Sequence, residues 1–70
     1  MSNQSDLAEV SSLRSQLEEL AERLEAVALR YRETPDSAVA IDLFEAERAL
    51  RSAGRVMGRA LATLGELTGS

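Results

Sequence analysis

The chain has 70 residues, which gives room for one small domain and no more. It contains no cysteine and no histidine, which excludes a disulfide framework and a histidine-bearing structural metal site as supports for so small a fold. The formal net charge is −4, and all eight basic residues are arginines. Arginine without lysine, beside many alanines and leucines, favours a bacterial source with high-GC coding.

The first residues, Met1 to Asp6, are polar and lack the basic leader and apolar core of a signal peptide. No uninterrupted apolar run approaches the ~18 residues that a membrane-crossing helix needs. We therefore expect a cytoplasmic protein that does not bind a membrane.

A first helix is expected over residues 6–33. Asp6, followed three residues later by Glu9, forms a start that resembles a capping box, and residues 1–5 are expected to be frayed. From Val10 to Tyr31 the apolar residues recur at alternating spacings of three and four. This 3.5-residue period is typical of a helix that keeps one stripe toward a partner helix.

The first helix is expected to stop at a short turn, Thr34–Ser37. Pro35 disfavours helical geometry at Thr34 and has no N–H to donate, so Thr34 is expected to be the N-cap of a second helix over residues 35–67. Residues 68–70 are expected to form a tail. Because a short connection leaves neighbouring helices antiparallel, the sequence predicts an all-α fold, a single antiparallel helical hairpin over residues 6–67.

The apolar positions of the two halves match when the chain is folded about Pro35. Facing residue numbers then sum to 70, and in alternate layers a large residue faces an alanine. Complementary sizes let two helices approach closely without voids, so Ala53→Leu is expected to overpack the hairpin. This predicted seam pairs Tyr31 with Val39, Val27 with Leu43, Leu24 with Ala46, Leu20 with Leu50, Leu17 with Ala53, Leu13 with Met57 and Val10 with Ala60.

Helix 2 also carries apolar and small residues outside the predicted seam, so it is expected to contact more than one helix. A homodimer of hairpins that forms a four-helix bundle is the simplest structure that covers them, and a mixed bundle with another protein is the alternative. The residues expected in the oligomer interface are Leu7, Ala49, Gly54, Val56 and Leu61.

Charge is distributed unevenly, because residues 48–65 carry four arginines and no acid. The spacings of three and four place these arginines on one ridge of helix 2, which is expected to point away from the predicted seam. Such a ridge can receive an acidic helix of a protein partner, grip the phosphates of a nucleic acid, or be a solvated face. The residues expected to contact a partner are Ile41, Phe44, Arg48, Arg51, Arg55 and Arg59.

Neither catalysis nor metal or cofactor binding is indicated by the sequence. A helical di-metal site uses inward-facing glutamates beside histidines, whereas histidine is absent here. The sole phenol, Tyr31, is next to the turn, and no base that would activate a serine is evident. The acids of the first helix are expected to form a solvated outer face, namely Glu18, Glu19, Glu22 and Glu25.

The expected function is that of a small non-enzymatic regulatory or adaptor module, which self-associates by helical packing and binds a protein through the outer face of helix 2. In plan alone, a dimer of two-helix hairpins resembles the small Rop-type plasmid regulators. That resemblance covers two helices and one turn, includes no diagnostic string of residues, and implies RNA binding through the arginine ridge as an alternative function. A second alternative is a pure assembly element.

Overall fold

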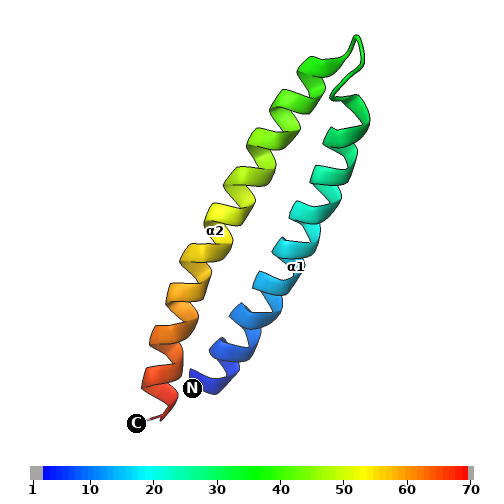
Figure 1. Ribbon diagram of the computed structural model, residues 1–70. Coiled ribbons are helices and arrows are strands. Elements are labelled where there is room, and N and C mark those ends of the chain that lie inside the picture. Colours follow the sequence, from blue (N-terminus) through cyan, green and yellow to red (C-terminus); the bar gives the residue numbers. More distant parts are fainter. Residues whose placement is uncertain (1–2, 70) are drawn as a thin grey trace.

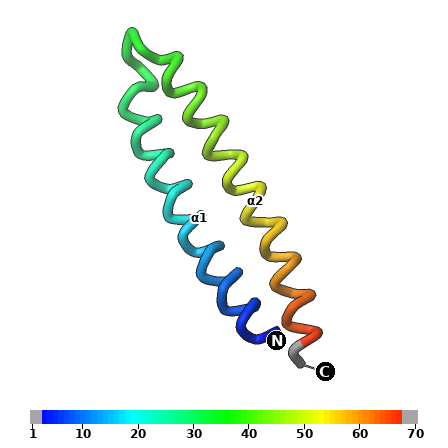
Figure 2. The backbone as a smooth tube through the Cα atoms, turned by 180° about the vertical axis from the view of Figure 1, so that it is seen from behind, coloured from blue at the N-terminus to red at the C-terminus, as the bar shows by residue number. Residues whose placement is uncertain are grey.

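The computed structural model describes residues 3–69, with side chains described as far as Leu67. It consists of two helices, α1 (Asn3–Tyr31) and α2 (Ser37–Gly69), which lie side by side and antiparallel (Figure 1). The hairpin measures 55 × 14 × 14 Å, and both chain ends lie at the end opposite the turn (Figure 2). The predicted all-α helical hairpin is confirmed.

The helix ends differ from the predicted ends by a few residues. α1 begins at Asn3, so Asp6 lies within its first turn, where the partial positive charge of the helix N-terminus favours a carboxylate. α1 ends at Tyr31 rather than near residue 33, and α2 continues to Gly69. Residues 1–2 of the expected frayed start and residue 70 of the expected tail lie outside the described residues.

Thr34 connects the two helix ends at the turn. Its hydroxyl donates to the Tyr31 carbonyl oxygen at 2.8 Å, and its Oγ1 accepts from the Asp36 N–H at 3.2 Å. The second bond spans two residues and lies within the turn, because α2 begins only at Ser37; the predicted role of Thr34 as N-cap of a helix that starts at residue 35 is therefore not confirmed. Regular α-helix starts after the tight bond from Ser37 N–H to the Thr34 carbonyl.

Thr34→Ala is expected to lower the free energy of unfolding by about 1 kcal/mol, because it removes one hydrogen bond from the end of α1 and one from the turn that precedes α2. Urea unfolding followed by circular dichroism measures the change. Thr34→Ser keeps the hydroxyl and is the matched control. An equal loss of stability in both variants would show that the methyl group, and not the two hydrogen bonds, stabilises the turn.

Small residues form the closest contact between the helices. Ala21 and Ala28 of α1 are completely buried, and Ala40 and Gly54 of α2 are buried opposite them. No large side chain among the described residues is fully buried. The two helix backbones therefore approach each other over a line of buried residues, most of them small, which we call the contact line.

The predicted pairing of residues whose numbers sum to 70 is wrong by about one residue. A Cβ atom placed on Gly54 would lie 3.4 Å from Leu17 Cδ2, so Leu17 faces Gly54 and not Ala53. Ala53 is exposed, and its replacement by leucine is therefore not expected to overpack the hairpin. Half of the predicted seam is instead exposed: Leu13, Leu20, Tyr31, Val39, Ala46, Ala53 and Ala60.

Candidate interaction site

The hairpin has two unlike sides, and a pocket of about 260 Å³ marks one of them. Its lining includes residues that directly follow the contact line: Glu22 follows Ala21, and Arg55 follows Gly54. Successive helix positions differ by about 100°, so residues that follow the contact line lie on one side of each helix. We call the pocket side the charged face, defined by Arg14, Glu18, Glu22, Arg51 and Arg55.

Two ion pairs cross single turns of helix on the charged face. Arg14 Nε lies 3.3 Å from Glu18 Oε1, and Arg51 Nε donates a hydrogen bond to Glu47 Oε2. Glu47 is only 8% exposed, which makes it the buried charge of the contact line. The hydrogen bond from Arg51 satisfies a carboxylate that would be costly to bury alone.

Arg51 also lies in the field of the acids of α1. Its hydrogen bond to Glu47 has the largest effect and raises the pKa of its guanidinium. Burial lowers this pKa by less than the hydrogen bond raises it, and the negative charges of Glu47, Glu25 and Glu22 each raise it by a smaller amount. The charge of Arg51 is directed toward its own hairpin, which reduces its value as a partner contact.

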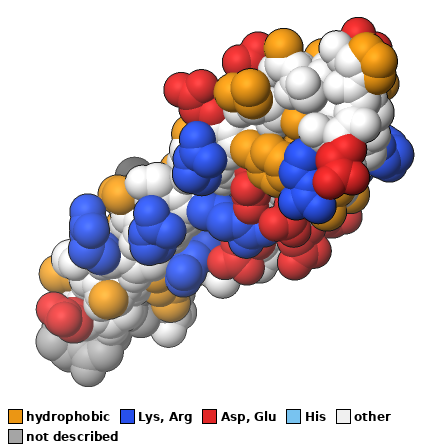
Figure 3. Space-filling view, turned by 45° about the horizontal axis from the view of Figure 1, so that its top comes forward, with side chains coloured by type: hydrophobic (Ala, Val, Ile, Leu, Met, Phe, Trp, Pro, Cys, Tyr) orange, Lys and Arg blue, Asp and Glu red, His pale blue; other side chains and the backbone are white. Residues whose placement is uncertain are grey.

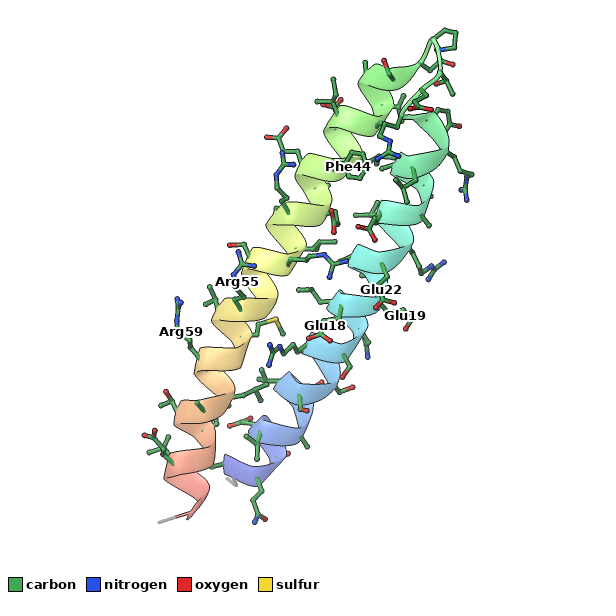
Figure 4. The ribbon with its side chains drawn as sticks, in the orientation of Figure 1. Glu18, Glu19, Glu22, Phe44, Arg55 and Arg59 are labelled. Atoms are coloured by element: carbon green, nitrogen blue, oxygen red, sulfur yellow. The ribbon has the colours of Figure 1, made fainter. Side chains whose placement is uncertain are left out.

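The arginine ridge is divided between the pocket and the outer side of α2. Arg51 and Arg55 line the pocket beside α1, whereas Arg48 and Arg59 do not. Figure 3 shows that blue arginine side chains gather on one face of the hairpin beside red carboxylates. Arg55 lines the pocket, whereas Arg59 projects outward from α2 (Figure 4). Arg48, Arg55 and Arg59 are exposed.

Gly58 lies against a side chain of α1. A Cβ atom placed there would lie 3.0 Å from Nη1 of Arg14, so the guanidinium packs directly on the backbone of α2. Because Gly54 and Gly58 have no side chain, they allow α1 to lie close to the backbone of α2. The small-residue spacing of these two glycines is explained by the hairpin itself.

The two apolar residues of the predicted partner surface, Ile41 and Phe44, differ in exposure. Ile41 is 66% exposed, which leaves it open to a partner. Phe44 is partly buried, and its ring lies between the two helices (Figure 4). Phe44 therefore belongs first to the hairpin interface, with only its remaining surface available to another molecule.

The residues predicted for the oligomer interface lie in two different places. Leu7 and Leu61 are partly buried and Gly54 is buried, close to the contact between α1 and α2. Ala49 and Val56 are exposed on α2, Val56 at 50%. Leu7, Gly54 and Leu61 are therefore largely used within one hairpin, while Ala49 and Val56 remain accessible.

A second surface lies on the side of the hairpin opposite the pocket. It consists of residues that directly precede the contact line, as Leu20 precedes Ala21 and Ala53 precedes Gly54. The sequence pattern found these residues but assigned them to the hairpin contact. We define the apolar face by its exposed members, Leu13, Leu20, Tyr31, Val39, Ala46, Ala53 and Ala60.

The acids of α1 are exposed, as expected, and Glu18 and Glu22 border the pocket with their carboxylates (Figure 4). Within the described part of the chain, no three acidic side chains come close enough together to hold a metal ion. Neither described helix has a stretch both long and apolar enough to span a membrane.

Comparison with protein-family models, with curated proteins and with solved structures gives no match for this chain. Function is therefore inferred from the two surfaces alone.

Proposed function

We propose that the chain is a small non-enzymatic adaptor, which self-associates and binds a protein partner through the exposed side of α2. The observation that carries this proposal is the unequal use of the arginines. Arg51 is held by Glu47, whereas Arg48, Arg55 and Arg59 form an exposed stripe beside the open side chain of Ile41. A stripe of guanidinium groups next to an apolar side chain suits an acidic amphipathic helix of another protein.

The charge of the surroundings favours a protein over a nucleic acid. The carboxylates of Glu18 and Glu22 lie in the same pocket as Arg55, and Glu47 neutralises Arg51. A backbone of closely spaced phosphates would meet these acids as well as the arginines, whereas the acids of a partner helix can be spaced to meet the arginines alone. RNA binding stays the second candidate because three exposed arginines share one stripe.

The proposal is tested with two probes, a fluorescent glutamate-rich amphipathic peptide and an RNA stem-loop, each titrated at low and at physiological salt. We expect saturable binding of the peptide, weakened at least tenfold by Arg55→Glu/Arg59→Glu. The control Arg23→Glu/Arg32→Glu reverses the same number of exposed charges outside α2 and should leave binding unchanged.

The other outcomes of this titration contradict the proposal. RNA affinity that falls steeply with salt, in the absence of peptide binding, would favour the RNA-binding candidate because phosphate contacts release counterions. Binding of neither probe at either salt concentration would leave only the role of an assembly element. Equal weakening by both pairs of substitutions would show non-specific charge attraction.

A further inference from the structure

The apolar face is continuous across both helices. In α1 the positions that fill it, from Leu13 to Tyr31 at spacings of three and four, carry no charge. The same holds in α2 from Val39 to Leu64. Because antiparallel helices that face each other are related by a twofold axis through their contact, residues that precede the contact line fall on the same side in both helices. The pocket, lined by residues that follow this line, confirms this placement for the opposite side.

Half-buried side chains extend the apolar face toward the middle of the hairpin. Leu24 of α1, like Leu50 and Met57 of α2, is only partly covered by the opposite helix. Each of them lies between the contact line and the exposed residues of the apolar face. A molecule seated on this face would complete the burial of these side chains, which the hairpin by itself leaves unfinished.

The two halves of the face are complementary in size. The exposed positions of α1 are large, with Leu13 45% and Leu20 50% exposed, whereas those of α2 are the alanines Ala46, Ala53 and Ala60. A surface whose large half fits its own small half is suited to a second copy of itself. Laying α1 on α1 would bring leucines against leucines and alanines against alanines, which packs less evenly.

We propose that the apolar face binds a second copy of the chain, with α1 of one hairpin lying over α2 of its partner and both turns at the same end. This inference specifies the self-association in the proposed function. The twofold axis then runs along the length of the bundle. It places Leu20 of one copy near Ala53 of the other, because the hairpin register puts these residues at similar distances from the turn.

Size and charge support this arrangement. A face on a hairpin 55 Å long and 14 Å wide can bury on the order of 800 Å² per partner, the size of a standard stable interface. At the edge of the face, exposed Arg30 and exposed Asp42 lie at similar distances from the turn, on α1 and α2 respectively. The proposed orientation brings Arg30 of each copy beside Asp42 of the other, so that opposite charges meet at the rim.

Crosslinking of single-cysteine variants tests the face and the orientation together. The chain has no cysteine of its own, so each variant carries one reactive thiol. We expect a short bismaleimide to join Leu20→Cys to Ala53→Cys in a mixture of the two full-length variants. Glu19→Cys mixed with Ser52→Cys is the matched control, because these exposed residues are neighbours of the first pair in sequence but lie off the apolar face.

Three results of this experiment would overturn the inference. Crosslinking of Leu20→Cys to itself, but not to Ala53→Cys, would contradict the orientation. Crosslinking of the control pair alone would assign self-association to another face. Sedimentation equilibrium of the unmodified chain at the monomer mass of 7.6 kDa, across the concentrations used, would exclude the dimer.

A substitution gives an independent measurement on the folded chain. Ala53→Leu is expected to weaken the dimer at least tenfold in sedimentation equilibrium while its helical circular dichroism signal stays unchanged, because leucine would meet the leucines of the partner. Ser52→Leu is the control and should leave the dimer intact. Since Ala53 lies on a different side of α2 from the arginine stripe, loss of the dimer in Ala53→Leu with retained peptide binding separates this inference from the proposed partner site.

Discussion

Replacing Ala21 by leucine is expected to lower the free energy of unfolding by about 1–3 kcal/mol, the usual cost of overpacking a well-packed contact. Ala21 is 0% exposed, and the two backbones approach most closely over residues of its size. The additional carbons of leucine have no space unless the helices separate. Separation would also withdraw Leu17 from Gly54, so the effect extends beyond one residue.

Ala26→Leu is the matched control for this prediction. Ala26 is on the same helix but is exposed, so a leucine there adds surface without displacing α2. Urea unfolding at a fixed protein concentration measures both variants, since self-association would make the midpoint depend on concentration. Equal stability of Ala21→Leu and Ala26→Leu would contradict the contact between α1 and α2 described here.

The two helices and their turn are predictable from local features of the sequence. Pro35 breaks the helical pattern once, the 3.5-residue period of the apolar positions indicates a partner helix, and the short turn makes the two helices antiparallel. These features depend only on residues close together in the sequence. The fold class can therefore be predicted from them, whereas the exact helix ends cannot.

The register is not predictable from the same pattern. Apolar residues at a 3.5-residue period fit two adjacent contact lines equally well, and the choice between them depends on size. The hairpin places small residues on the line, such as Ala28 and Gly54, and leaves Leu20 beside it. Glu47 lies on the line as well, which a rule that counts only apolar residues excludes.

The position of the arginine ridge follows from the register. The spacing correctly places Arg51 and Arg55 on one side of α2, but whether that side faces α1 depends on which residues form the contact line. Successive residues lie about 100° apart around a helix, so a shift of one residue at half of the contact positions is enough to bring part of a ridge to the edge of the interface. The same shift moves half of the predicted seam onto the apolar face.

Phe44→Ala is expected to lower the free energy of unfolding by about 2 kcal/mol, roughly half the usual cost of removing a fully buried phenylalanine. The ring lies between α1 and α2 and is partly buried there (Figure 4). Its loss would open a space in the contact near the turn. A large change in stability would assign Phe44 to the hairpin interface in addition to any contact with a partner.

Ile41→Ala provides the comparison, because Ile41 is 66% exposed on the same helix, one turn from Phe44. We expect its removal to leave urea unfolding almost unchanged, since little of its surface is covered in the hairpin. Peptide binding measured on the same two variants then separates folding from recognition. If Ile41→Ala weakens peptide binding without loss of stability, Ile41 belongs to the partner surface. If Phe44→Ala leaves the free energy of unfolding unchanged, Phe44 does not stabilise the hairpin and its predicted role as a partner contact is favoured.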